Sequence, residues 1–138
     1  MVSGNFNIAR VPHTIFGAGR FDRLAPIISE RAKTVLLVTG AHSLQRSGHL
    51  QKLTTSLSKL SVKIYPVCVK GEPTPEYVDD VTGEYRDKNI DVVTAIGGGS
   101  VLDAGKAISA MLTQNDSVMN YLEGVGHKTH NGQKVPAT

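Results

Sequence analysis

Three continuous apolar stretches divide the chain and predict buried β-strands. They cover residues 34–39 (TVLLVT), 62–69 (VKIYPVCV) and 91–96 (DVVTAI). Apolar residues that follow one another without alternation are typical of parallel strands, because helices cover both faces of such a sheet. Pro66 lies within the second stretch. Since proline cannot donate a backbone hydrogen bond, we expect this strand to lie at an edge of the sheet or to end there.

Amphipathic helices are predicted between and after these strands. One carries an apolar stripe spaced by three and four residues, formed by Leu50, Leu53, Leu57 and Leu60. A second is expected to begin at Thr74 as N-cap with Pro75 as its first helical residue, and a third at Ser100. A shorter helix over residues 21–28 has Pro26 in its first turn or is limited by it. Strands that alternate with helices predict an α/β fold, a Rossmann-like open parallel sheet with helices on both faces.

The two ends of the chain have weaker patterns. Residues 6–8 and 14–16 are expected to pair as a small hairpin. After Leu112 the apolar periodicity fades, and residues 115–138 are rich in Gly, Asn, His and Lys, with only a turn expected over residues 116–122. Domains rarely end on a long segment without regular structure. We therefore expect one α/β domain over residues 1–114 and a connecting segment over residues 115–138 that leads to a further domain outside this chain.

Composition narrows the classes of protein and partner. The chain has 138 residues, 40% of them hydrophobic, without an apolar run of the roughly 18 residues that cross a membrane. The N-terminus has neither a basic leader nor a long apolar stretch, so no signal peptide is expected. Cys68 is the single cysteine and is expected to be buried, which favours a reducing, cytoplasmic location. The net charge of +3 comes from scattered side chains and aromatics make up only 5%, so neither nucleic acid nor membrane is expected as a partner.

The most informative segment is the glycine turn Gly97, Gly98 and Gly99, which follows the third strand and leads into a helix at Ser100. Glycines allow a phosphate to approach the backbone, and the free amides and dipole of a helix start favour an anion. The alternative is a purely structural turn, with Ser100 and Asp103 as a capping box. The spacing matches neither the usual dinucleotide fingerprint, whose third glycine would replace Leu102, nor a phosphate-binding P-loop.

Five segments in the same order resemble the iron-containing alcohol dehydrogenase family. The glycine turn with Asp103 and Lys106 is similar to that family's cofactor turn. The other similar segments are residues 16–19 (FGAG), 38–40 (VTG), 72–75 (EPTP) and 121–124 (YLEG). Together they span almost the whole chain, which makes the resemblance far more specific than a glycine turn alone.

The resemblance implies an NAD(P)-dependent enzyme that oxidises an alcohol or reduces an aldehyde by hydride transfer. In that family the pyrophosphate of the cofactor lies on the turn, here Gly98, Gly99 and Ser100, and we expect Gly97 and Asp103 to belong to the same cofactor site. A helical second domain supplies one Asp and three His ligands to Fe²⁺ or Zn²⁺, which acts as a Lewis acid. A strand containing Pro-Thr-Thr completes the cofactor cleft, and we expect this chain to stop a few residues before it. The full-length enzyme is expected to form a homodimer or larger homo-oligomer, and this chain alone to be inactive.

Two positions depart from the family pattern. Many NAD-dependent members carry Asp where this chain has Gly40, and that carboxylate would repel a 2′-phosphate. We therefore expect NADP to be accepted, with Ser43 or Arg46 available to the phosphate, although NAD stays possible and Gly40 could simply end the strand. Thr74 stands where many members have Asn to contact the adenosine, so we expect Thr74 to take that place in the cofactor site.

No metal site is expected within this chain. His127 and His130 would share one face of a helix, but their neighbours Gly126 and Gly132 favour a loop. Other functions stay open: a stand-alone nucleotide-binding module without catalysis, or a relative of the glycerol dehydrogenases, which tend to carry Lys at the position of Ser100. Maleylacetate reductases and dehydroquinate synthases share the same architecture and are alternatives as well.

Overall fold

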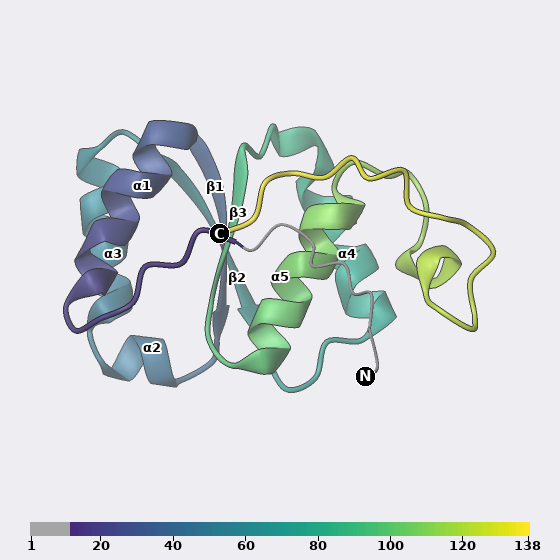
Figure 1. The fold of residues 1–138 in the computed structure, drawn as a ribbon, viewed down its shortest axis with the longest axis horizontal. Coiled ribbons are helices and arrows are strands. Elements are labelled where there is room, and N and C mark those ends of the chain that lie inside the picture. The colour runs from purple at the N-terminus through teal and green to yellow at the C-terminus, as the bar shows by residue number, and fades with distance from the viewer. Residues whose placement is uncertain (1–11) are drawn as a thin grey trace, which may run out of the picture.

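The computed structural model describes residues 12–138. In this part of the chain, three strands form a parallel sheet. The order across the sheet is β2 (Lys63–Val69), β1 (Thr34–Gly40), β3 (Val92–Ile96). Helices lie on both sides of the sheet, so that the molecule has three layers (Figure 1). The open parallel α/β fold predicted from the apolar stretches is therefore confirmed.

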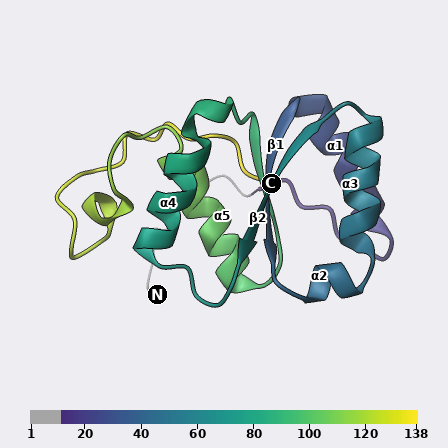
Figure 2. The same ribbon diagram turned by 180° about the vertical axis from the view of Figure 1, so that it is seen from behind.

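The helices divide between the two faces, as the opposite views in Figures 1 and 2 show. Helices α1 (Leu24–Arg31) and α3 (His49–Lys59) cover one face, and α4 (Pro75–Tyr85) and α5 (Gly99–Met111) cover the other. The short elements are η1 (Arg20–Arg23), α2 (Ser43–Arg46), η2 (Arg86–Lys88) and η3 (Val118–Tyr121). The helix α2 was not predicted, since its four residues are too few to show a period. None of the helices over residues 12–138 has the length and apolar character needed to cross a membrane.

Strand β1 is the centre of the structure. Leu36 and Val38 point into the core under α4 and α5, whereas Val35 and Leu37 point into the core under α1 and α3. All four side chains are at most 1% exposed. Because successive residues of a strand face opposite sides, a strand that is covered twice must be apolar throughout. This is the physical reason for the uninterrupted run that predicted the strand.

Strand β2 lies at an edge of the sheet, as Pro66 predicts. The two faces of this strand are covered unequally: Val67 and Val69 are buried, whereas Pro66 and Cys68 are exposed. The expectation that Cys68 is buried is therefore wrong. Helices cover both faces of the middle strand β1 but leave one face of the edge strand β2 exposed. An apolar run in the sequence does not distinguish these two cases.

The predicted start of α4 is confirmed, whereas the helix predicted over residues 21–28 begins as η1 at Arg20 and continues as α1 to Arg31. Thr74 is the N-cap of α4, where its Oγ1 accepts a hydrogen bond of 3.2 Å from the backbone N–H of Tyr77, and Pro75 is the first helical residue. Pro26 lies in the first turn of α1. In α3, the apolar stripe predicted from Leu50 to Leu60 is one residue too long. Leu60 follows the last helical residue and is exposed.

The segment after α5 is ordered by specific contacts. Asp79 of α4 accepts hydrogen bonds from the Ser117 hydroxyl and the Val118 backbone at the start of η3, which is the turn predicted there. The buried Ser109 of α5 donates to the Val135 carbonyl, which holds the segment on the helix.

The last residues of the chain add to the sheet. Ala137 pairs in parallel with Val93, and the Thr138 amide donates 2.9 Å to the Val93 carbonyl. This isolated bridge lies outside β1, β2 and β3, so the expectation that the chain stops a few residues before the Pro-Thr-Thr-containing strand stays a prediction. At the other end, residues 14–16 have no regular structure and residues 6–8 lie outside the described part, so the hairpin stays a prediction.

Two glycines of α4 and α5 should respond oppositely to alanine. Gly83 is exposed and a methyl group there would meet no heavy atom within 4 Å, whereas one at Gly105 would lie 2.6 Å from the Ala95 Cβ. We expect Gly83→Ala to raise the free energy of unfolding by about 0.5–1 kcal/mol. Gly105→Ala should lower it by about 1–3 kcal/mol, because α5 must move off β3. Urea denaturation checks both, and equal responses would contradict this packing.

The cap of α4 gives a second prediction. Thr74→Ala removes the acceptor of the Tyr77 amide and should lower the free energy of unfolding by about 1 kcal/mol. Thr74→Ser keeps the hydroxyl and serves as the matched control, and we expect it to leave the free energy of unfolding nearly unchanged because serine caps helices at least as well as threonine. A loss of the same size in both variants would show that the methyl group, rather than the cap, stabilises the helix.

Candidate functional site

The carboxyl ends of the three strands meet at one edge of the sheet. Gly40 of β1 pairs with Val69 of β2, and Thr39 pairs with Ile96 of β3. The chain leaves β1 toward α2 and α3 on one face, and leaves β3 toward α5 on the other (Figure 1). Ligands of open α/β sheets bind where the connections of neighbouring strands diverge in this way. The point between β1 and β3 is therefore the candidate site.

The glycines of the turn have two different roles. A methyl group at Gly97 would lie 2.6 Å from Val101 Cγ2, so that this glycine is required for the tight passage from β3 to α5. At Gly98 and Gly99 it would meet nothing within 4 Å. The structural explanation of the turn thus accounts for Gly97 alone. Gly98 and Gly99 instead leave the start of the helix open to an approaching group.

The start of α5 offers backbone N–H groups that have no hydrogen-bond partner among residues 12–138. Gly98 is the N-cap with an extended backbone, and its carbonyl accepts from the amides of Val101 and Leu102, each at 3.1 Å. The amides of Gly99 and Ser100, the first two helical residues, precede the first intrahelical bonds. The aligned peptide dipoles of this 13-residue helix place roughly half a positive charge at the same end. An anionic group such as a phosphate fits this arrangement.

The predicted capping box does not form. Ser100 is the second residue of α5 and not its N-cap, and its hydroxyl donates to Glu72 Oε1 at 2.7 Å. Asp103 lies further along the helix, exposed, with Lys106 Nζ 3.6 Å from its carboxylate. A capping box requires the serine at the N-cap. Here Gly98 takes that position, and Asp103 therefore lies apart from the turn.

Gly40 lies at the end of β1 beside the glycine turn. A methyl group there would lie 3.5 Å from Val101 Cγ2, which is an ordinary contact distance. Packing therefore does not require a glycine at this position, and its backbone does not need one either, because its φ is not positive. Ser43 begins α2 after β1, and Arg46 ends that helix. Position 40 therefore places no negatively charged side chain at this edge of the sheet, although the packing there would tolerate a side chain.

A hollow of about 170 Å³ lies beside the loop after β2. Its walls are Val69, Lys70, Glu72, Pro73, Thr74 and Tyr77. The Tyr77 hydroxyl donates 2.9 Å to the Cys68 carbonyl, and the pKa of Tyr77 is raised by burial first and by its neighbours Cys68 and Tyr85 next. Tyr77 and Glu72 were not predicted as site residues. Glu72 belongs to the EPTP segment, but only the fold shows that its carboxylate reaches α5.

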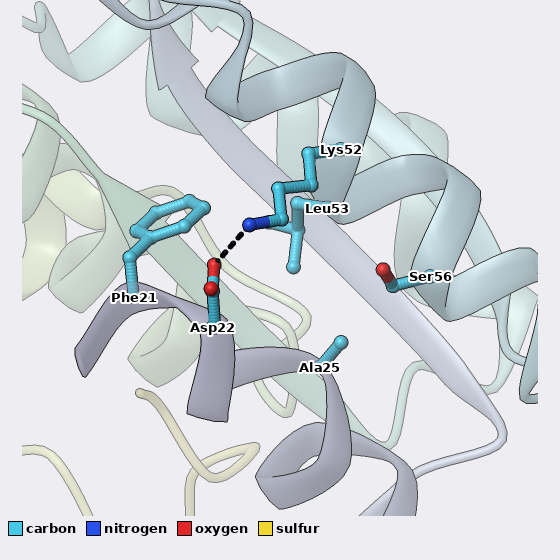
Figure 3. Close-up of a pocket in the computed structure, with 6 residues that line it drawn as sticks. All are labelled: Phe21, Asp22, Ala25, Lys52, Leu53 and Ser56. Carbon is cyan, nitrogen blue, oxygen red and sulfur yellow. Dashed lines mark hydrogen bonds and ion pairs between the residues drawn. The ribbon is translucent and has the colours of Figure 1, made fainter. Parts of the chain in front are cut away.

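A second hollow, of about 40 Å³, lies between α1 and α3 on the other face. Figure 3 shows Lys52 reaching toward Asp22 across it, with 2.7 Å between Nζ and Oδ1, and Phe21 beside them. Both charged side chains are more than half exposed. Ion pairs of this kind contribute little to stability, and the hollow is too small for a cofactor.

The histidines of the last segment lie in a loop, as their neighbours predict. His130 Nε2 lies 3.0 Å from the Ala110 carbonyl, and Nδ1 accepts from the Gly132 amide at 2.9 Å. Both nitrogens therefore have backbone partners. Over residues 12–138, no three His, Cys, Asp or Glu side chains gather in a way that could hold a metal ion.

Comparisons with known proteins give one consistent result. The family model described as iron-containing alcohol dehydrogenase matches residues 12–138. The probable NADH-dependent butanol dehydrogenase 1 of Bacillus subtilis is 35% identical over 107 residues, which are 77% of this chain and 28% of that protein. The NADH-dependent butanol dehydrogenase A of Clostridium acetobutylicum is 32% identical over 108 residues, again 77% of this chain and 28% of the relative.

Solved structures agree on the fold. The NADH-dependent butanol dehydrogenase A of Thermotoga maritima superposes with a TM-score of 0.84 at 23% identity, over 96% of this chain and 33% of the other. The chain thus spans about a third or less of the proteins that it matches. With the family model matched from residue 12 to residue 138, this chain belongs to the iron-containing alcohol dehydrogenase family.

Proposed function

We propose that this chain is the cofactor-binding part of an NAD(P)-dependent alcohol dehydrogenase that oxidises an alcohol or reduces the corresponding aldehyde. The observation that carries the proposal is the open start of α5 at Gly98 and Gly99, placed at the carboxyl edge of the sheet. Family membership and the names of the relatives from Bacillus subtilis and Clostridium acetobutylicum support it.

The described residues fit a dinucleotide in three places. The amides of Gly99 and Ser100 would receive the pyrophosphate, and Gly98 leaves room for it. The hollow beside Thr74 is suited to the adenosine, and the edge at Gly40 and Ser43 to its ribose. The bound cofactor would supply the group that accepts or donates hydride. A catalytic Fe²⁺ or Zn²⁺ and the substrate pocket are proposed for the part of the full-length protein beyond this chain, which alone should show no turnover.

Dinucleotide binding tests the site directly. In calorimetric titrations with NAD⁺ and NADP⁺, we expect saturable binding that weakens at least about tenfold in Gly98→Val/Gly99→Val, because two isopropyl groups fill the open approach to the amides. Gly83→Val, also at a position with open space, is the control and should bind like the wild type. Circular dichroism verifies that all variants are folded. The proposed site would be contradicted if neither nucleotide binds to any protein that keeps Gly98 and Gly99.

The 2′-phosphate gives a finer test. We infer that NADP is accepted, since position 40 carries no carboxylate and packing does not require a glycine there. The relatives named NADH-dependent favour NAD instead. Gly40→Asp should weaken NADP⁺ binding about tenfold or more by like-charge repulsion while NAD⁺ binding is kept. Gly40→Asn, the uncharged counterpart, should keep both. A wild-type chain that binds NAD⁺ and rejects NADP⁺ would refute the inference.

A further inference from the structure

Glu72 places a negative charge at the anion-binding end of α5. This residue lies in the loop between β2 and α4, two residues before the N-cap Thr74. Its carboxylate accepts the Ser100 hydroxyl at 2.7 Å, although 28 residues separate the two in the chain. The contact therefore connects the wall of the hollow beside Thr74 with the helix that carries the glycine turn.

The contact uses a donor that a phosphate would need. A serine hydroxyl has one O–H to donate, so Ser100 cannot serve Glu72 and a phosphate oxygen together. The positive end of the helix attracts the carboxylate for the same reason that it attracts a phosphate. If both anions were held there, they would repel each other across a few ångströms. The carboxylate and a bound phosphate therefore exclude each other at Ser100.

Among residues 12–138, no cationic side chain forms an ion pair with Glu72. The ion pairs of residues 12–138 are Lys52 with Asp22, Lys106 with Asp103, and Lys128 with Asp116. Lys70 lines the same hollow but does not pair with Glu72. Ser100 is the hydrogen-bond partner that the described structure gives to this exposed carboxylate. Within the described part of the chain, the negative charge of Glu72 is therefore available to act on a ligand of the turn.

We propose that Glu72 is an affinity-determining residue of the cofactor site, a competing anion that must leave Ser100 before the pyrophosphate binds. This inference rests on the proposed function. In the structure without ligand, the carboxylate satisfies the Ser100 hydroxyl and the helix end. Binding exchanges it for the diphosphate, and the loop between β2 and α4 releases its contact with α5. The exchange weakens the binding of every ligand that carries this diphosphate.

The test compares neutral variants with a matched control. Glu72→Gln removes the charge, and Glu72→Ala removes the charge and the acceptor. Glu76→Gln removes the charge of another exposed glutamate, in the first turn of α4. In calorimetric titrations with NAD⁺ and with ADP, we expect both Glu72 variants to bind about threefold or more tightly than the wild type, and Glu76→Gln to bind like the wild type. Thermal unfolding verifies that all four proteins are equally folded.

The outcomes separate this inference from the proposed function. Tighter binding in the Glu72 variants supports competition, and so does binding that appears in them when the wild type binds neither ligand. Wild-type binding that is unchanged or weakened in both Glu72 variants overturns the inference and leaves the cofactor site intact. If no protein of the series binds NAD⁺ or ADP, the proposed function fails and the inference fails with it.

Discussion

The close approach of α5 to β3 is the constraint on which the site depends. Gly105 leaves room for Ala95, and Gly97 leaves room for Val101, so that the helix lies directly on the strand that precedes it. A side chain at either glycine would push the helix outward and turn its first residues away from the edge of the sheet. The position of the free amides at Gly99 and Ser100 is therefore a consequence of packing further along the same helix.

The candidate site is assembled from three connections that the parallel arrangement brings to one edge. The turn after β3 provides the open helix start, the end of β1 provides the uncharged Gly40, and the loop after β2 provides Glu72 and Thr74. In the proposed site, the turn after β3 offers amides to an anion and the end of β1 leaves the edge uncharged. The loop after β2 adds the carboxylate that competes with the anion. Under the proposed competition, the affinity of the site for a diphosphate depends on the backbone amides of α5 and on the Glu72 side chain from another loop.

Family membership and structure together define what this chain contributes. The chain matches the family from residue 12 onward and corresponds to about a third or less of its relatives. Within that part, the final residues extend the sheet beside β3 and Ser109 fixes them to α5. The substrate and the metal of the reaction are proposals for the full-length protein. The cofactor site is the part of the function that this chain itself can be tested for.

The sequence by itself determined the strands, the principal helices and the glycine turn. Those features depend on local rules: buried strands must be apolar, amphipathic helices repeat every three to four residues, and Thr74 with Pro75 starts a helix. The tertiary structure alone decided which glycines are structural, why Cys68 is exposed, and that residue 137 pairs with β3. It also decided that the Ser100 hydroxyl donates a hydrogen bond to Glu72 and that Ser100 is not the N-cap of α5. These outcomes depend on distances between segments far apart in the chain, and no local pattern of residues encodes them.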